Sequence, residues 1–347
     1  MYSLSLYFNL MRLNMAELIL SSKVVDEVKG EPFYDRNMGA AKEAAEKYAK
    51  KHKGFVAPMH LLLRNFPHFD WHTANMEDIS GFDKEGIFVS KNEPVVITYQ
   101  GGFNGDGVLS SEKIKQALEL YDQKKGGLNA VYAAVLADLY PNKEVIAELL
   151  RGNMPDGQKV DIFSYRQILA GENKQHNAEF RPYAIVRPLS LARETVSGYG
   201  SIDRLTDDKG KVKDSQVIVY AGGVEEAQNV IDNARRKFKS GKLGVWHPFN
   251  LDKFSPEQEQ ARVGYLGVSG DGSLIGDYGL SNNARFVGVA PEAPVAPKNL
   301  GAEAQGKPES KLVFIPSLEQ VMAVSGRFTD DANKEQLRQE LEKLYRQ

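Results

Sequence analysis

Two apolar runs share one pattern, Val-Ile-x-Tyr-x-Gly-Gly, at residues 96–102 and 217–223. Runs of β-branched and aromatic residues are typical of buried strands, and a glycine pair permits the chain to turn where a strand ends. Apolar residues at helical spacing follow each run. We therefore expect residues 96–99 and 217–220 to be buried strands of one sheet, each ending in a glycine turn before a helix.

The two glycine turns, Gly101 with Gly102 and Gly222 with Gly223, are candidate ligand-binding residues. Backbone N–H groups at a helix start attract anions, and ligands of open α/β sheets gather beyond the carboxyl ends of strands. Neither turn carries a complete phosphate-binding glycine motif, so a turn that only reverses the chain is the alternative. The acidic residues 225–226 also oppose a phosphate at the second turn, because they satisfy the same helix dipole.

Other periodicities predict further elements. An alanine-rich segment predicts a helix over about residues 35–51, the sequence Asp-Asp-Lys-Gly predicts a hairpin turn at 207–210, and residues 243–246 read as a strand. Mixed strand and helix patterns of this kind are typical of an α/β fold. We expect a mixed or mostly parallel central sheet with flanking helices and a more irregular second lobe.

Composition along the chain predicts its division into parts. A turn-rich break near residues 152–157 and a later stretch rich in Ala, Pro, Gly and Glu mark the boundaries. The expected parts are an N-terminal extension at 1–20 with Met11 and Met15 as alternative starts, a first α/β lobe at 21–160, a second α/β lobe at 161–289, an extended linker at 290–310, and a C-terminal strand and helices at 311–347 that pack on the core.

Charge and cysteine content narrow the classes of protein. The formal net charge is -2, with 44 basic and 46 acidic residues, so no basic field indicates a nucleic-acid partner. The chain has no cysteine, which excludes disulfides, thiolate metal sites and cysteine nucleophiles and fits a cytoplasmic protein. No apolar segment reaches the length of a membrane span, so we expect no membrane partner.

One histidine cluster has ligand types suited to a divalent metal ion. In Pro-His-Phe-Asp-Trp-His, an extended backbone would place His68, Asp70 and His72 on one face. Two imidazoles and a carboxylate can bind zinc or iron, so these three residues are the candidate metal site. A structured loop with surface histidines is the alternative.

Two arginines and one further histidine complete the candidate site. Arg181 and Arg187 flank a predicted short strand, where a guanidinium could bind a carboxylate or phosphate, or form an ordinary surface pair. His247 follows the strand expected at residues 243–246 and is the candidate acid or base. No serine elbow, kinase signature or zinc-protease helix motif accompanies it.

Two functions remain open from the sequence. The first is an enzyme that acts on a small anionic metabolite in a cleft at strand ends, shaped by the glycine turns. The second is a protein without catalysis that binds ligands or assembles with itself, which fits the neutral charge and the absence of catalytic motifs, with a homo-oligomer as its expected state.

Overall fold

The computed structural model describes residues 18–20, 28–64, 66, 71–101, 107–123, 134–140, 144–248, 259–267, 272–278, 280 and 282–290. Residues 1–294 form one compact unit of the chain. The predictions for residues 1–17, for the linker beyond residue 290, and for the C-terminal strand and helices therefore lie outside the described residues. No helix within the described ranges is long and apolar enough to cross a membrane.

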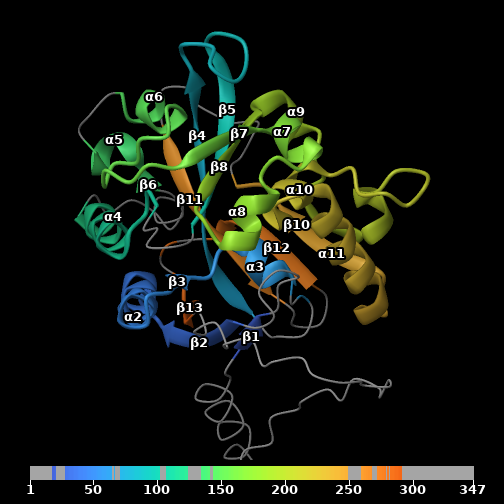
Figure 1. Ribbon diagram of the computed structural model, residues 1–347, viewed down its shortest axis with the longest axis horizontal. Coiled ribbons are helices and arrows are strands. Elements are labelled where there is room, and N and C mark those ends of the chain that lie inside the picture. The colour runs from blue at the N-terminus through green and yellow to red at the C-terminus, as the bar shows by residue number, and fades with distance from the viewer. Residues whose placement is uncertain are drawn as a thin grey trace, which may run out of the picture. The chain divides into compact units, whose positions relative to one another are not determined.

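The described residues form a mixed sheet of nine strands in the order β7, β8, β5, β4, β11, β12, β10, β9, with β6 paired to β11 (Figure 1). Their bounds are β4 (His72–Asp83), β5 (Glu93–Gln100), β6 (Ala134–Val135), β7 (Asp161–Ser164), β8 (Tyr183–Pro188), β9 (Gly198–Ser201), β10 (Lys242–Trp246), β11 (Gln260–Gly267) and β12 (Gly272–Tyr278). β7 is parallel to β8 and β10 to β12, whereas the other neighbours are antiparallel. The expected mixed sheet of an α/β protein is thus present, although most of its pairs are antiparallel.

The first apolar run is a buried strand, as predicted. Residues 96–99 lie in β5, which is central because it pairs with β4 on one side and β8 on the other. Ile97 pairs with Ile79 and Val186, so its side chain has apolar neighbours from both strands. Strands from before and after residue 160 are therefore neighbours in one sheet.

The prediction for the second run is wrong, because residues 217–220 lie in helix α10 (Ser215–Ala221). Asp214 caps the start of this helix by accepting hydrogen bonds from the backbone N–H groups of Gln216 and Val217, each at 3.0 Å. Gly222 ends it in the left-handed conformation, with φ of 76°. These two caps fix a short helix, and its full burial accommodates β-branched residues that would also suit a strand.

A smaller sheet of four strands has the order β1 (Leu18–Leu20), β2 (Val28–Asp35), β13 (Ala284–Ala290) and β3 (Phe55–Val56). The helix expected over 35–51 is confirmed as α2 (Met38–Lys51), which packs on β13 and β2. The side chain of Asn37 caps α2 by accepting a hydrogen bond from Ala40 N at 3.0 Å.

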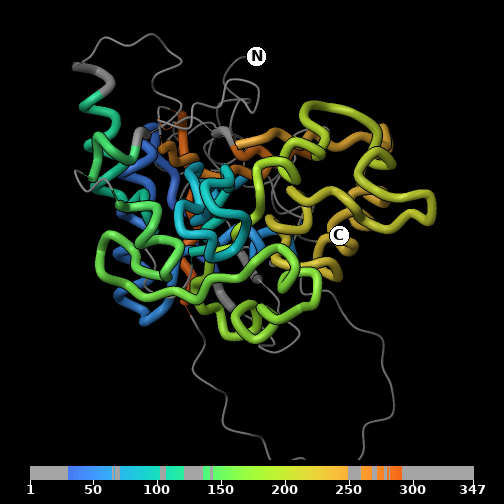
Figure 2. The backbone as a smooth tube through the Cα atoms, turned by 90° about the horizontal axis from the view of Figure 1, so that it is seen from above, coloured from blue at the N-terminus to red at the C-terminus, as the bar shows by residue number. Residues whose placement is uncertain are grey.

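Helices cover the larger sheet in two separate cores. Their bounds are α3 (Met59–Arg64), α4 (Ser111–Gln123), α5 (Leu136–Leu139), α6 (Val145–Leu150), α7 (Tyr165–Ala170), α8 (Lys174–Glu179), α9 (Leu189–Arg193), α10, α11 (Val224–Lys237) and the 3-10 turn η2 (Ile202–Leu205). One core joins α3, α10 and α11 to β10 and β12, and the other joins α2, α4, α5 and α6 to β5. Figures 1 and 2 agree that α4 to α6 and α10 to α11 lie on opposite sides of β4 and β5.

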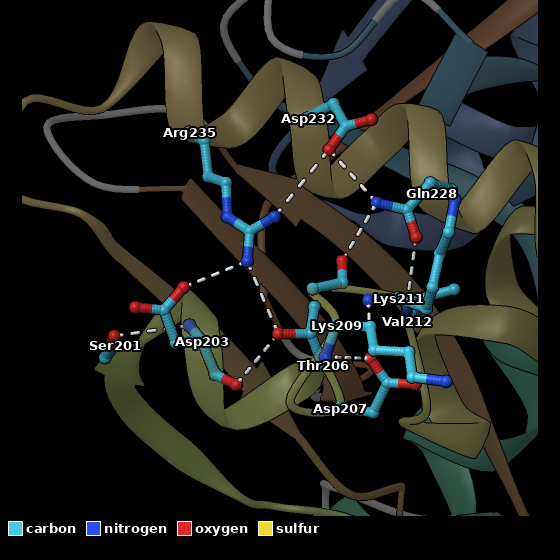
Figure 3. Close-up of polar contacts among 11 residues, drawn as sticks. Ser201, Asp203, Thr206, Asp207, Lys209, Lys211, Val212, Gln228, Asp232 and Arg235 are labelled. Carbon is cyan, nitrogen blue, oxygen red and sulfur yellow. Dashed lines mark hydrogen bonds and ion pairs between the residues drawn. The ribbon is translucent and has the colours of Figure 1, made fainter.

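The predicted hairpin turn at 207–210 is confirmed. Thr206 pairs with Val212 across it, and Asp207 closes it with its backbone N–H donating to Lys211 O at 2.7 Å. Two side chains of α11 hold this hairpin (Figure 3): Gln228 accepts from Val212 N at 2.9 Å, and Arg235 contacts Thr206. The hairpin is therefore fixed against α11 on one side.

Candidate functional site

A pocket of about 450 Å³ opens between the segment after α6 and the end of α8. Its volume lies in the range of small-molecule sites. Its lining residues are Arg151, Gly152, Gln158, Lys159, Val160, Asp161, His176, Arg181 and Pro182. We call it the Arg181 pocket.

A short hairpin after α6 forms one wall of the Arg181 pocket. Gly152 has a φ of 78°, in the left-handed region, and a side chain there would collide with Val160 O. Its carbonyl accepts a hydrogen bond from Val160 N at 3.0 Å, and Asn153 pairs with Lys159. The hairpin ends where β7 begins, so Lys159 and Asp161 reach the pocket from one tight segment.

His176 and Asp161 form a close polar contact inside the pocket. Asp161 begins β7, and the parallel register sets it beside Tyr183 of β8. His176 lies on α8 with its Nε2 atom 2.6 Å from Asp161 Oδ2, and Phe163 and Tyr183 contact the ring edgewise. The aromatic contacts and the carboxylate fix the orientation of the imidazole.

Arg181 enters the pocket because α8 ends abruptly. Phe180 adopts the left-handed conformation with φ of 54°, and the N–H of Arg181 donates to His176 O at 3.0 Å. This turn sets Arg181 next to His176. The Arg181 guanidinium is exposed and pairs with Glu179 through Nε to Oε2 at 2.9 Å.

A chain of polar contacts holds Arg151 and Lys159, the other two cationic side chains of the pocket. Arg151 donates to Glu148 at 2.5 Å and to Glu85, and Asn153 bridges Glu148 to Lys159. Hydrogen bonds from Asn153 and Arg151 lower the pKa of Glu148, and the bond to Glu148 raises the pKa of Arg151. Both groups are therefore charged at neutral pH, and Arg151 and Lys159 face the same pocket.

The lining has a distinct electrostatic character. Three cationic side chains line the pocket against a single carboxylate, Asp161, which His176 already contacts. The acids that pair with the arginines, Glu85, Glu148 and Glu179, are not lining residues. No hydroxyl or thiol is among the lining residues, so within the described site His176 has no nucleophile to activate.

The second glycine turn borders a different pocket, of about 350 Å³, between α7 and the start of α11. Gly222 O accepts hydrogen bonds from the Asn173 and Asn177 amides at 2.7 and 2.9 Å. The Glu226 carboxylate lies against Gly223, since a side chain there would meet Oε2 at 2.5 Å. Glu225 and Glu226 balance the two lysines of this pocket, so its lining favours an anion less than the Arg181 pocket does.

Gly101 and Arg187 are both buried. Gly101 donates its N–H to Asn75 O at 2.9 Å, and a side chain there would collide with the Asn75 amide, so this glycine permits a close backbone approach. Gly102 lies outside the described residues.

Arg187 is 0% exposed and donates to Ser215 Oγ at 3.1 Å and Gln216 Oε1 at 2.8 Å. Its guanidinium thus holds the start of α10 instead of facing the surface.

His247 contacts the segment after α9. Its Nε2 lies 2.5 Å from Thr195 Oγ1 and 3.1 Å from Thr195 O, and its backbone N–H donates to Ser197 Oγ at 3.3 Å. These contacts join the end of β10 to that segment. His247 lines neither pocket described above, and its predicted role as acid or base is untested.

The predicted metal site is described in part. His68 and Asp70 lie outside the described residues. His72 is buried at the start of β4. Its pKa is lowered to about 3, mainly by burial and to a smaller extent by the charge of Arg285. Among the described residues, no group of three His, Asp or Glu side chains is arranged to bind a metal ion.

Sequence reasoning found Arg181 but missed Arg151, Lys159, Asp161 and His176. No motif joins the last two, because they are 15 positions apart and meet only through the fold. The parallel pairing of β7 with β8 and the left-handed turn at Phe180 bring them together. The one local sequence feature at the pocket is the turn-rich segment at 152–157, which the sequence pattern predicts to be a boundary between lobes. In the folded chain this segment forms a wall of the pocket.

Comparisons with known proteins do not assign a family. No family model and no curated protein matches the chain. One solved structure, described as "Accommodation of massive sequence variation in Nanoarchaeota by the C-type lectin fold", is similar at 22% identity and a TM-score of 0.48, covering 76% of this chain and 98% of that chain. Similarity at this level gives the protein neither a function nor a ligand.

Proposed function

We propose that the protein binds a small anion with carboxylate or phosphate groups in the Arg181 pocket, and that it does not transform the ligand. The observation that carries this proposal is the set of three cationic side chains, Arg151, Lys159 and Arg181, around one pocket with a single carboxylate. Guanidinium groups bind carboxylates and phosphates through two parallel hydrogen bonds, which favours this ligand class over neutral molecules.

Arg151 and Arg181 can leave their glutamate partners for a ligand at a small cost in free energy. Arg151 and Arg181 are each more than 40% exposed, as are Glu85 and Glu179, so their pairs are screened by water. Exposed ion pairs contribute little stability, and exchanging a glutamate for a ligand oxygen keeps the cation satisfied. The glutamates then hold the arginines close to the pocket in the absence of ligand.

Isothermal titration calorimetry with citrate and with inorganic phosphate tests the proposal and distinguishes the two anion types. We expect saturable binding of at least one anion, weakening as salt is added. Arg181→Ala and Lys159→Ala should each reduce affinity by roughly 10- to 100-fold, because a hydrogen bond to a charged group contributes about 1.5–3 kcal/mol.

Arg236→Ala and Lys237→Ala are matched controls, since both residues are exposed on α11 and line neither pocket. Their affinities should equal that of the unaltered protein. Absence of binding to both anions, or equal losses in the control variants, would contradict a site at the Arg181 pocket.

Acid–base catalysis by His176 is the second candidate function, favoured by the 2.6 Å contact with Asp161. A carboxylate that orients an imidazole is common in enzymes that transfer protons. Product release from aryl phosphates or aryl esters that disappears in His176→Gln would establish catalysis. Anion binding without any product would leave the binding function alone.

A further inference from the structure

The second pocket, of about 350 Å³ between α7 and the start of α11, has an apolar wall. Ile168 and Leu169 of α7 and Val224 of α11 line it, and Leu169 and Val224 are 48% and 37% exposed. An apolar group of a ligand that covers these side chains removes them from water, which is favourable. The volume lies at the lower end of the range for small-molecule sites, so the ligand is small. We call this space the Asn173 pocket.

The lining residue Asn173 has a buried acceptor without a donor. Asn173 is 0% exposed, and its Oδ1 atom accepts no hydrogen bond from any described residue. The orientation of the amide is fixed, because its Nδ2 atom lies 2.7 Å from Gly222 O, and a carbonyl oxygen only accepts. The nearby Tyr183 hydroxyl cannot supply the donor, since it donates to Asn177 Oδ1 at 2.7 Å. Buried polar atoms are nearly always hydrogen-bonded, so a donor that enters the pocket completes this amide.

A carboxylate lies at the same turn. The Asn173 amide binds Gly222 O, and the Glu226 carboxylate lies against the next residue, Gly223, where a side chain would meet Oε2 at 2.5 Å. Glu226 makes no hydrogen bond or ion pair with a described residue, and the charge of Arg64 acts on it only from a greater distance. A buried acceptor and a carboxylate at one turn match an ammonium group, which donates three hydrogen bonds and carries the opposite charge.

A lysine supplies the opposite charge from another segment of the chain. Lys211 lines the pocket from the hairpin, and the side chain of Gln228 on α11 hydrogen-bonds to the backbone of both residues that flank it, at 2.9 and 3.3 Å (Figure 3). The Lys211 ammonium makes no hydrogen bond or ion pair within the described part of the chain. Lys174, the other lysine of the lining, pairs with Glu225 at 3.7 Å. Lys211 therefore remains as a cation for a ligand carboxylate.

The pocket thus combines two acceptors, one cation and an apolar wall. A free α-amino acid with an apolar side chain carries the three complementary groups, whereas a simple anion would meet the Glu226 carboxylate. We propose that the Asn173 pocket binds such an amino acid. Asn173 and Glu226 bind its ammonium group. Lys211 binds its carboxylate, and Leu169 and Val224 cover its side chain.

Isothermal titration calorimetry with L-leucine, L-valine and L-methionine tests this proposal. We expect saturable binding of at least one of them. Two analogues of leucine each lack one charged group: leucinamide has no carboxylate, and 4-methylpentanoate has no ammonium. Each should bind at least about tenfold more weakly than leucine, because it loses a hydrogen bond between charged groups. The proposal is overturned if none of the three amino acids binds, or if either analogue binds as tightly as leucine.

Three variants assign the charged groups. Lys211→Ala and Glu226→Gln should each weaken amino-acid binding at least about tenfold. Lys211→Ala should leave the affinity for leucinamide unchanged, which a general folding defect would not do. Lys209→Ala is the matched control, since Lys209 is an exposed lysine of the same hairpin and lines neither pocket.

Circular dichroism checks that each variant is folded, and the Lys211 comparison decides the outcome even if Glu226→Gln does not fold. Equal losses of leucine affinity in Lys209→Ala and Lys211→Ala would contradict the proposal. So would a loss of leucinamide affinity in Lys211→Ala as large as the loss for leucine, because leucinamide offers this lysine no carboxylate.

Discussion

Replacing Gly222 by alanine should destabilise the protein strongly. Gly222 has a φ of 76°, which alanine adopts at a cost of about 1–2 kcal/mol. The new methyl group would meet Tyr183 Oη at 2.7 Å and Asn177 Nδ2 at 3.0 Å. Because Tyr183 and Asn177 are buried, neither can move into solvent.

Any shift of the groups around the new methyl group also disturbs two buried hydrogen bonds, which the Asn173 and Asn177 amides donate to Gly222 O. An unsatisfied buried amide costs about 1–3 kcal/mol. Together with the backbone cost, we expect Gly222→Ala to lower the free energy of unfolding by about 3–5 kcal/mol. Since 1 kcal/mol shifts Tm by roughly 2–4 °C in a large domain, Tm should fall by roughly 6–20 °C.

Thermal and urea unfolding of Gly222→Ala and Gly157→Ala measure this effect. Gly157 is the matched control because its φ is 85° and no atom lies within 4 Å of the position that a methyl group would take there. The Gly157→Ala variant should show the backbone cost alone, with a Tm lower by about 2–8 °C. Equal shifts in the two variants would refute the close packing at Gly222.

Two other predictions concern pH. Burial alone raises the pKa of Asp83, but the backbone N–H groups of Gly86, Ile87, Phe88 and Val89 outweigh it and lower the pKa. Asp83→Asn should therefore lower the free energy of unfolding by about 1–3 kcal/mol at pH 7. In urea titrations the difference between the variant and the unaltered protein should shrink as the pH falls through the pKa of Asp83 in the folded protein, and a constant difference would contradict the carboxylate's role. Burial, and next Arg64, lowers the pKa of His60 to about 3, so below pH 6.5 only the unfolded chain takes up this proton and stability falls. His60→Gln should reduce the slope of unfolding free energy against pH between 6 and 4 by about 1.4 kcal/mol per unit, and an unchanged slope would exclude a neutral buried His60.

The same apolar string forms a strand in one place and a helix in the other, which shows where pattern reasoning succeeds and fails. At residues 96–99 the alternation agrees with pairing partners on both sides, β4 and β8. At 217–220 the two caps, Asp214 and Gly222, fix the run as a helix. Both caps are visible in the sequence as Asp-Ser before the run and Gly-Gly after it. The β-branched content between them favours a strand, and tertiary burial overrides that preference.

The candidate site was predictable only in part, for a physical reason. Arg181 was found because an arginine beside a predicted strand end is a local feature. The pairing of His176 with Asp161 depends on the parallel register of β7 and β8 and on the left-handed turn at Phe180. A left-handed phenylalanine has no local sequence signal, so only the folded chain shows that these side chains meet.

A crystal structure of the protein soaked with tungstate, a heavy phosphate analogue, tests the central claim most directly. Our account predicts anomalous density in the Arg181 pocket, within hydrogen-bond distance of Arg181 and at least one of Arg151 and Lys159. Density at the Gly222–Gly223 turn with an empty Arg181 pocket, or no ordered anion in either pocket, would contradict it.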